Sequence, residues 1–535
     1  MNFQIADLFE IVVDTVPNNE AIYDEKHRLT YAELDKRANK LAHYLRSIGV
    51  KAGDHIGLYI YNCAEYVEAI LAAAKISATT ININYRYVDE ELRYLLEDAD
   101  VKTLVFQRDL APVVERVLPT VPAVTHTIYI EDDSDASIAN IPNTIEYEAA
   151  IAPMNDERDF SGRSPDDRFI VYTGGTTGMP KGVEWRHEDL FFAGLQGGRP
   201  QGDPIQTPEE LAEVVAAGDF NANFHPAPPF IHGTSQFAAI IGLFAGGKLT
   251  IARNRSFDPA QTARLIQDEG INIIVLVGDA MCRPLLDEIR ANGDKYDLSS
   301  LLVVTSQGAI ISRSTITAFS ELLPNTMVLN NFGASETGHQ GQALGTVDED
   351  GRPQFFMSEE TVVLDDDLNI VEPGSGKVGR LARSGNIPMG YYNDPVKTAA
   401  TFVEHNGQRW VIPGDYATVD ADGLVSLLGR GSGCINTGGE KVYPEEVEEA
   451  IKDHADVVDV LVVGVADDRW GERVEAVVQV AQNATLTGDD LKDHLRTLVA
   501  GYKIPKNWHF REKIERQPSG KPDYRWAKEV AAGEA

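Results

Sequence analysis

The chain has 535 residues, of which 43% are hydrophobic, enough for several cores of ordinary size. Its formal net charge of −34 gives a long-range field that repels nucleic acid and anionic membrane surfaces. Cys63, Cys282 and Cys434 are odd in number and widely spaced, which argues against a disulfide framework and favours a reducing compartment, the cytoplasm. The acidic N-terminus shows no signal peptide, and every apolar stretch is too short or too interrupted by charge to span a bilayer.

The first part of the chain alternates helical and strand patterns. Thr30 and Glu33 form a capping-box pattern, apolar residues then recur at helical spacing up to Ile48, and Gly49 suits the position after a helix. A Thr-Pro pair at 207–208 predicts another helix start, with Thr207 as its cap. Further expected elements are helices Glu65–Lys75 and Asp89–Glu97, and strands Thr103–Phe106, Thr127–Ile130, Phe169–Tyr172, Ile273–Val277 and Leu301–Val304. This alternation predicts an α/β fold with largely parallel sheets.

A change of pattern follows the glycine-rich stretch Leu428–Gly433. An ordinary turn is one interpretation of this stretch, and a domain boundary is the other. After it, helices are expected at Glu446–Ile451 and Gly488–Leu498, and strands at Val457–Val463 and Val474–Val480. We therefore expect a large N-terminal domain over residues 1–430, a hinge at 431–433 and a small α+β domain over 434–535.

The loop after the strand Phe169–Tyr172 has a composition that fits either an ordinary turn or a phosphate-binding loop. Its glycines let backbone N–H groups turn toward one point, its threonines add hydroxyl donors, and its lysine adds a positive charge. It is not a Walker A loop, because Gly182 rather than Ser or Thr follows Lys181. The candidate phosphate ligands are Thr173, Gly174, Gly175, Thr176, Thr177, Gly178 and Lys181.

The whole string from Val171 to Gly182 resembles the phosphate loop of the adenylate-forming superfamily, which includes acyl-CoA synthetases, luciferases and peptide-synthetase adenylation domains. Other segments match that superfamily in order along the chain. They are Ser306–Ala309, Asn330–Gly338, Pro413–Tyr416, the Gly-Arg pair at 429–430, and Pro518–Lys521. The resemblance implies an α/β fold: a large N-terminal domain with stacked mixed and parallel sheets, plus a small mobile C-terminal α+β domain.

The resemblance also implies roles for individual residues. Glu336 and Thr173 would hold Mg²⁺ on the phosphates of ATP, and a carboxylate suits this hard cation. Lys521 would be the lysine needed for adenylation, and Asp415 and Arg430 would reach the ribose. The remaining nucleotide-site residues would be Gly308, Ala309, Asn331, Phe332, which lies against adenine, Gly333 and Ser335.

Two segments indicate the branch of the superfamily. Ala227–Ser235 resembles the segment in which acyl-CoA synthetases place a histidine, here His232, beside the acyl carboxylate. No aspartate follows Phe230, where amino-acid-activating domains carry one. Ile435–Glu448 resembles the segment that lines the pantetheine tunnel of CoA ligases, so CoA is expected to contact Gly438, Gly439 and Lys441. Among CoA ligases, strings such as Asn386–Asn393 are similar to actinobacterial acyl-CoA synthetases that activate steroid side-chain acids.

The sequence thus predicts an AMP-forming acid–thiol ligase that converts a bulky steroid or terpenoid carboxylic acid, through acyl-AMP, to an acyl-CoA thioester. Gly174, Gln307, Ser335 and Ser432 depart from the usual superfamily pattern, which leaves the strength of the adenylation step open. Competing functions are a fatty-acid CoA ligase, transfer to a carrier protein, a ligase that only forms thioesters from a partner enzyme's acyl-AMP, and a silent ligand sensor. The expected partner is a small-molecule acid, without nucleic acid or stable membrane insertion; a homodimer is left open.

Overall fold

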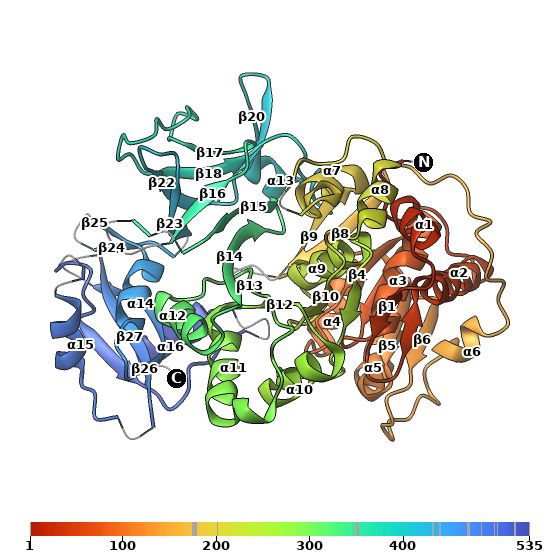
Figure 1. The fold of residues 1–535 in the computed structure, drawn as a ribbon, viewed down its shortest axis with the longest axis horizontal. Helices are drawn as coiled ribbons and strands as arrows, with labels where there is room; N and C mark the ends of the chain where they lie inside the picture. Colours follow the sequence, from red (N-terminus) through yellow and green to blue (C-terminus); the bar gives the residue numbers. More distant parts are fainter. Residues whose placement is uncertain are drawn as a thin grey trace.

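The structure is a computed structural model, and it describes residues 2–173, 179–200, 202–345, 347–348, 353–430, 433–437, 440–467, 471–482, 484–496, 498–499, 501–517 and 521–533. Within these residues the strands form three sheets, of 15, eight and five strands (Figure 1). The eight-stranded sheet has the order β19-β9-β8-β4-β3-β5-β6-β7, and the five-stranded sheet has the order β25-β24-β27-β26 with β28 paired to β27. The largest sheet runs β2-β1-β11-β10-β12-β13-β14-β15-β16-β23-β22-β18-β21-β20, with β17 paired to β18.

The strands of the largest sheet are β1 Glu20–Tyr23, β2 Arg28–Thr30, β10 Asn223–Pro226, β11 Lys248–Thr250, β12 Ile273–Leu276, β13 Val303–Ser306, β14 Met327–Ala334, β15 Gly338–Ala343, β16 Gln354–Met357, β17 Thr361–Leu364, β18 Gly379–Arg383, β20 Phe402–His405, β21 Gln408–Val411, β22 Asp415–Val419 and β23 Val425–Arg430. Those of the eight-stranded sheet are β3 His55–Tyr59, β4 Thr79–Asn82, β5 Val101–Gln107, β6 His126–Ile130, β7 Thr144–Glu146, β8 Arg168–Thr173, β9 Lys181–Arg186 and β19 Gly390–Tyr391. The C-terminal sheet contains β24 Ile435–Thr437, β25 Glu440–Val442, β26 Val457–Asp467, β27 Gly471–Val480 and β28 Asn507–Phe510.

The α-helices are α1 Ile5–Thr15, α2 Tyr31–Ser47, α3 Ala64–Lys75, α4 Asp89–Asp98, α5 Ala111–Val117, α6 Tyr147–Ile151, α7 His187–Ala193, α8 Glu210–Ala217, α9 Gly233–Phe244, α10 Pro259–Glu269, α11 Gly278–Asn292, α12 Arg313–Leu322, α13 Pro395–Thr401, α14 Pro444–Lys452, α15 Gly488–Leu495 and α16 Tyr524–Ala532. Short 3₁₀ turns lie at Arg108–Leu110, Leu118–Thr120, Gln196–Gly198 and Gly293–Lys295. Among the described residues, no helix has the length and apolar character that crossing a membrane requires.

The fold class predicted from the sequence is confirmed: both large sheets combine parallel and antiparallel pairs. β3, β4, β5, β6 and β7 are joined by parallel pairings, as are β10, β12, β13 and β14. Antiparallel pairs then extend both sheets, at β8–β9 and from β14 onward. Because parallel strands of one sheet end at the same edge, the loops after β12 and β13 lie beside each other. The end of β8, which belongs to the eight-stranded sheet, meets these loops and so completes the candidate site.

Most of the predicted elements are present, and the capping box at Thr30 is confirmed. Thr30 accepts from the Glu33 backbone N–H, the Glu33 carboxylate accepts from the Thr30 N–H, and Gly49 follows the helix with a φ of +97°. The helix start predicted at Thr207 is wrong, because the helix begins at Glu210. The Thr207 hydroxyl instead donates to the Glu210 carboxylate, so the Thr-Pro pair forms the turn that precedes the helix.

Several other boundaries differ from the prediction by a few residues; β27, for example, begins at Gly471 rather than at Val474. The strand expected at Leu301–Val304 is β13, Val303–Ser306, because the Leu301 N–H donates to the Leu298 carbonyl in a turn and the ladder with β12 begins at Val303. α15 ends at Leu495 rather than at Leu498, and β26 extends to Asp467, beyond the predicted Val463.

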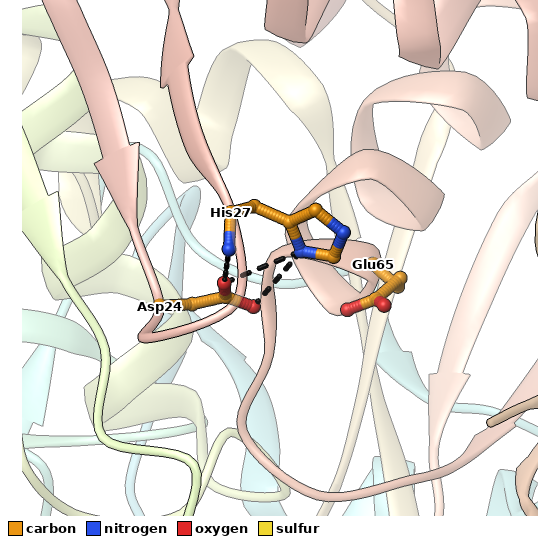
Figure 2. Close-up of side chains that lie close together, drawn as sticks. All are labelled: Asp24, His27 and Glu65. Carbon is orange, nitrogen blue, oxygen red and sulfur yellow. Dashed lines mark hydrogen bonds and ion pairs between the residues drawn. The ribbon is translucent and has the colours of Figure 1, made fainter. Parts of the chain in front are cut away.

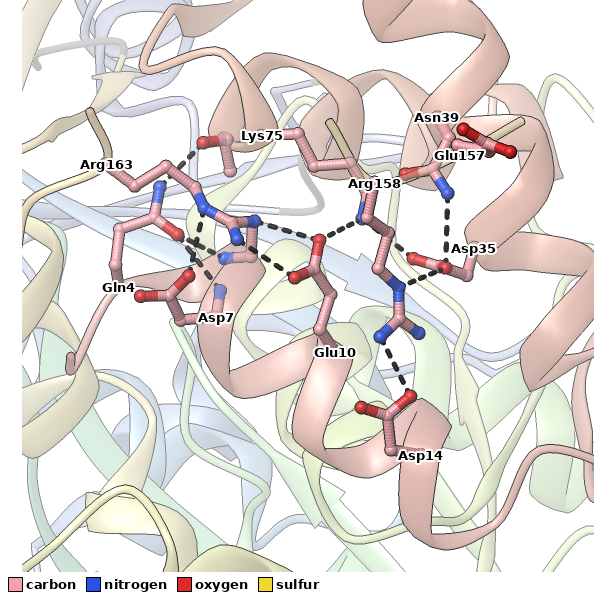
Figure 3. Close-up of polar contacts among 12 residues, drawn as sticks. Gln4, Asp7, Glu10, Asp14, Asp35, Asn39, Lys75, Glu157, Arg158 and Arg163 are labelled. Carbon is pink, nitrogen blue, oxygen red and sulfur yellow. Dashed lines mark hydrogen bonds and ion pairs between the residues drawn. The ribbon is translucent and has the colours of Figure 1, made fainter. Parts of the chain in front are cut away.

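A buried polar network fastens the N-terminal helix α1 to α2 and α3 (Figure 3). The Lys75 side chain is fully buried, and its Nζ donates to Glu10 Oε1 at 2.6 Å and to Asp35 Oδ1 at 2.7 Å. Arg163 pairs with both Glu10 oxygens at 2.8 and 2.9 Å, and Arg158 pairs with Asp35 at 2.8 Å. Hydrogen bonds and charge from Arg163 and Lys75 hold the pKa of the Glu10 carboxyl below its usual range, against the opposing effect of burial.

The C-terminal sheet lies beside α11 and α12 of the preceding part of the chain (Figure 1). Arg283 on α11 and the Arg313 backbone N–H at the start of α12 donate to atoms of this C-terminal part. Gly429 on β23 faces α14, and a side-chain carbon at this position would collide with the Glu445 carboxylate. The two parts are therefore docked through polar contacts at their edges.

Candidate active site

A pocket lies where the ends of β8, β13 and β14 meet the start of α9. Its lining combines the main-chain turns of the large sheets with one side chain from the C-terminal part of the chain. The lining includes Thr173, His232, Gln307, Gly308, Gly333, Ser335 and Lys521. All but Gln307 are residues that the sequence predicts for the site, so segments as far apart as 173 and 521 meet at one place.

The Asn82 side chain ties two walls of this pocket together, and sequence reasoning missed it. Its amide donates to the Tyr172 carbonyl at 2.7 Å and to the Ile231 carbonyl at 2.6 Å, while its oxygen accepts from the Tyr172 N–H at 2.7 Å. Tyr172 precedes Thr173, and Ile231 precedes His232. Asn82 is buried at the end of β4, so its three bonds fix the spacing between the strand that carries the loop and the start of α9.

His232 lies at the N-terminus of α9 and lines the pocket. Its Nε2 is buried and has no hydrogen-bond partner among the residues that the structure describes. Burial lowers the pKa of His232 to about 3, and the positive charges of Lys521 and Arg86 act in the same direction. The ring is therefore neutral at neutral pH, and its Nε2 retains an unused hydrogen-bonding capacity next to the pocket.

The depressed pKa of His232 predicts a pH-dependent contribution to stability. In the unfolded chain His232 gains a proton near pH 6.5, whereas in the folded chain it gains one only near pH 3. Protonation below pH 6.5 therefore favours the unfolded chain, and the free energy of unfolding falls as the pH drops from 6.5 toward 3. We expect the His232→Gln variant to gain stability relative to the parent protein by about 2 kcal/mol between pH 7 and pH 5. Urea unfolding of both proteins at the two pH values measures this, and an unchanged difference would contradict it.

Lys521 reaches the pocket from the C-terminal part of the chain. Gly308, after β13, has a φ of +86°, and a side-chain carbon built there would lie 3.5 Å from Lys521 Cε and 3.9 Å from Thr234 Oγ1. Glycine is the residue that adopts this backbone conformation without strain. The lysine side chain thus lies against the backbone turn that the sequence predicts for the nucleotide.

The carboxylate of Glu336 is oriented by Tyr391, a residue that sequence reasoning did not select. The Tyr391 hydroxyl donates to Glu336 Oε1 at 2.8 Å, and the buried Trp185 Nε1 donates to the Ser335 carbonyl at 3.0 Å. Lys181 forms an ion pair with Asp394, in the same short segment as Tyr391. The segment from β19 to α13 therefore holds both a predicted phosphate ligand and a predicted metal ligand.

The other predicted nucleotide residues lie around the pocket rather than in its described lining. Asn331 donates to Thr305 Oγ1 at 2.8 Å, and Phe332 packs edge-on against Phe355 with ring centroids 5.9 Å apart. The Ala309 carbonyl accepts from Ser306 Oγ at 2.6 Å. These three residues shape the ends of β13 and β14.

Asp415 begins β22 and pairs in register with Arg430, the last residue of β23. Adjacent strands thus place both predicted ribose ligands at one sheet edge. Several other predicted ligands lie outside the described residues: Gly174, Gly175, Thr176, Thr177, Gly178, Gly438 and Gly439. Of Arg430 and Lys441 only the backbone is described, on β23 and β25.

One further cluster of potential metal ligands lies away from the pocket. One ligand atom each from Asp24, His27 and Glu65 lies within 4.8 Å of the others (Figure 2). Arg253 NH1, however, contacts Asp24 Oδ2 at 2.6 Å and Glu65 Oε2 at 3.2 Å, so an internal cation already balances these carboxylates. The cluster fastens the β1–β2 turn to α3 and is a structural ion-pair network.

Comparison with known proteins identifies the family. The AMP-binding enzyme family matches residues 9–392, and the C-terminal domain of AMP-binding enzymes matches residues 446–521. The chain belongs to the AMP-binding enzyme family. The 3-oxocholest-4-en-26-oate–CoA ligase of Rhodococcus rhodochrous is 47% identical over 99% of this chain and 96% of its own length. The medium/long-chain-fatty-acid–CoA/3-oxocholest-4-en-26-oate–CoA ligase of Mycolicibacterium smegmatis is 46% identical over 99% of this chain and 97% of its own length.

Two solved structures share this fold along nearly the whole chain. The anthranilate CoA ligase AuaEII, in complex with anthranoyl-AMP, superposes with a TM-score of 0.84 at 20% identity, covering 99% of this chain and 98% of its own. ATP-bound MatB from Rhodopseudomonas palustris superposes with a TM-score of 0.82 at 24% identity and covers 99% of each chain. Identities this low show the fold alone.

Proposed function

We propose that the protein is an AMP-forming acyl-CoA ligase that activates a bulky hydrophobic carboxylic acid, with a steroid side-chain acid as its preferred substrate. The observation that carries this proposal is the convergence of Lys521 and His232 on one pocket, in a chain of the AMP-binding enzyme family. Near-full-length identity of 47% to a 3-oxocholest-4-en-26-oate–CoA ligase supports the steroid acid.

The reaction proceeds in two displacements. First, a carboxylate oxygen of the acid attacks the α-phosphorus of ATP, which forms acyl-AMP and releases pyrophosphate. Lys521 stabilises the negative charge that develops on the transferring phosphoryl group, and the N–H of neutral His232 donates to the substrate carboxylate. Second, the thiolate of CoA attacks the acyl carbon, the bond to AMP breaks, and AMP leaves.

The residues present suit Mg²⁺, because the donor set consists of oxygens: the Glu336 carboxylate, held by Tyr391, and the Thr173 hydroxyl at the pocket. When bound, the cation supplies charge neutralisation to the phosphates of ATP. Asp415 and Arg430 are proposed to bind the ribose, and the segment from Gly438 to Lys441 is proposed to contact CoA. We also propose the domain division at 431–433, which falls between the end of β23 and the start of β24.

The deciding experiment is acid-dependent pyrophosphate release, measured with and without CoA. The panel of acids contains 3-oxocholest-4-en-26-oate, linear acids of medium and long chain, and benzoate. We expect the steroid acid to give the highest kcat/KM. The fatty acids form the second candidate, because the name of the Mycolicibacterium relative includes both substrate classes. Linear acids turned over well above the steroid acid would establish that second candidate instead.

The same assay distinguishes a carrier-protein acceptor, a thioester-only ligase and a ligand sensor from the proposed ligase. Pyrophosphate release without thioester formation on added CoA would indicate a carrier-protein acceptor. Thioester formation from synthetic acyl-AMP, without pyrophosphate release from ATP, would indicate a ligase that relies on acyl-AMP from a partner enzyme. Acid binding without either reaction would indicate a sensor.

The Tyr391–Glu336 hydrogen bond predicts a specific effect on the metal requirement. Outer hydrogen bonds to metal ligands typically change metal affinity about 10- to 100-fold. We therefore expect Tyr391→Phe to raise the Mg²⁺ concentration for half-maximal pyrophosphate release about tenfold. The matched control is Tyr392→Phe, whose hydroxyl donates to Asp100 at 2.9 Å on an exposed surface. A Mg²⁺ dependence that is identical in both variants would show that the Tyr391 hydroxyl does not hold Glu336 for metal binding.

A further inference from the structure

One arginine of the large domain holds the start of the C-terminal sheet. Arg283 lies on α11, and its NH1 donates to the Val457 carbonyl at 2.9 Å and to the Val458 carbonyl at 2.5 Å. On the other side of the guanidinium, Nε lies 3.2 Å from Asp279 Oδ2 and donates to Thr315 Oγ1 at 3.3 Å. Partners on its own domain thus orient the guanidinium toward the other domain.

The acceptor side has an unusual backbone geometry. Along a regular strand, successive carbonyls point in opposite directions, so one nitrogen does not bind two consecutive carbonyls. The register of β26 against β27 shifts between Val457 and Asp459, which makes Val458 the extra residue of a β-bulge. A bulge leaves its extra residue out of the ladder and redirects the backbone. Both carbonyls are therefore presented to Arg283.

The same bulge connects directly to the lysine in the pocket. Asp459, the next residue, accepts from Arg516 Nε at 2.7 Å and from Arg516 NH2 at 2.6 Å. Arg516 pairs as a β-bridge with Pro522, and the neighbouring Gln517 N–H donates to the Lys521 carbonyl at 2.9 Å. A bidentate arginine–carboxylate pair fixes orientation as well as distance. The contacts run from α11 through the bulge to the backbone of Lys521.

We infer that Arg283 is a positioning residue of the adenylation step, which docks the bulge of β26 so that Lys521 reaches the pocket. This inference rests on the proposed function, because it assigns Lys521 to adenylation. A second contact supports the same docked orientation: the Arg313 backbone N–H at the start of α12 donates to Glu449 Oε1 at 3.0 Å. Asp279 links the two contacts: its Oδ2 lies beside Arg283, and its Oδ1 accepts from the N–H of Ser312, the residue before Arg313, at 3.0 Å.

The test compares Arg283→Gln with Arg290→Gln, a control on the same helix whose arginine pairs only with exposed Asp287 at 3.5 Å among the contacts described. Losing hydrogen bonds from a charged group at an interface shifts a docking equilibrium roughly 10- to 100-fold. We expect Arg283→Gln to lower acid-dependent pyrophosphate release by that factor. Thioester formation from synthetic acyl-AMP and CoA should change less than about twofold, and the control should match the parent protein in both assays.

Two outcomes overturn the inference: an unchanged rate of pyrophosphate release in Arg283→Gln, or equal loss in both assays. Hydrogen exchange gives a readout that needs no activity. Docking should protect the facing ends of α12 and α14, so Arg283→Gln should speed exchange there while leaving the centre of β26 unchanged. If the parent protein fails to adenylate any acid, the proposed function fails, and exchange alone still decides whether Arg283 docks the sheet.

Discussion

Replacing Lys521 by alanine should abolish most acyl-AMP formation while sparing thioester formation from supplied acyl-AMP. The lysine lines the pocket together with Thr173 and His232, although it comes from the far end of the chain. Removing a charge that acts on the transition state costs about 10²–10³ in rate. In the second displacement the thiolate attacks the acyl carbon and no bond to the α-phosphorus forms or breaks, so we expect this step to depend far less on the lysine.

The measurement is pyrophosphate release from acid plus ATP, set against thioester formation from synthetic acyl-AMP plus CoA. Lys528→Ala on α16 is a suitable control, because it removes one positive charge from the same C-terminal part of the chain, outside the pocket lining. Equal damage to both reactions in Lys521→Ala would mean that the lysine supports the fold instead of the chemistry.

Replacing Lys75 by methionine should destabilise the N-terminal part of the chain by about 3 kcal/mol or more. The ammonium is fully buried and contacts one oxygen each of Glu10 and Asp35, which are also buried. Removing one member of a buried ionic group leaves opposite charges without their full compensation. Because Arg163 and Arg158 still contact these carboxylates, the expected loss lies at the lower end of the usual range for such changes.

Urea unfolding of Lys75→Met and of Lys36→Met measures this effect, since Lys36 lies exposed on the neighbouring helix α2. A triple variant, Lys75→Met with Glu10→Gln and Asp35→Asn, should recover part of the loss because it also removes the two buried negative charges. The loss in Lys75→Met should persist at high salt, because buried pairs are screened little. A loss no larger than that of Lys36→Met would contradict the prediction.

The sequence predicted those features that local patterns encode. The α2 helix was predictable because its cap, its apolar spacing and its terminal glycine lie within one segment. The pocket residues from Thr173 to Lys521 were predictable through resemblance, because each lies in a string whose order along the chain is shared. The start of α8 was not predictable from the sequence, because Thr207 can bond Glu210 either as a helix cap or within a turn.

The residues that sequence reasoning missed act through backbone atoms of distant segments. Asn82 binds main-chain groups of Tyr172 and Ile231, and Arg283 binds carbonyls about 174 positions along the chain. An asparagine at a strand end or an arginine on a helix carries no local sign of such partners, because any residue supplies a carbonyl. The role of Tyr391 was equally hidden in the sequence, because only the folded chain brings its hydroxyl to Glu336.

Gly429 shows how one domain constrains the composition of the other. Its φ of +104° favours glycine, and a side-chain carbon there would meet the end of the Glu445 side chain, which would have to move aside. The first constraint belongs to the strand itself, whereas the second comes from α14, a helix of the C-terminal part of the chain. A methyl group at this position therefore acts chiefly through backbone strain in β23, because the end of the Glu445 side chain can rotate away from it.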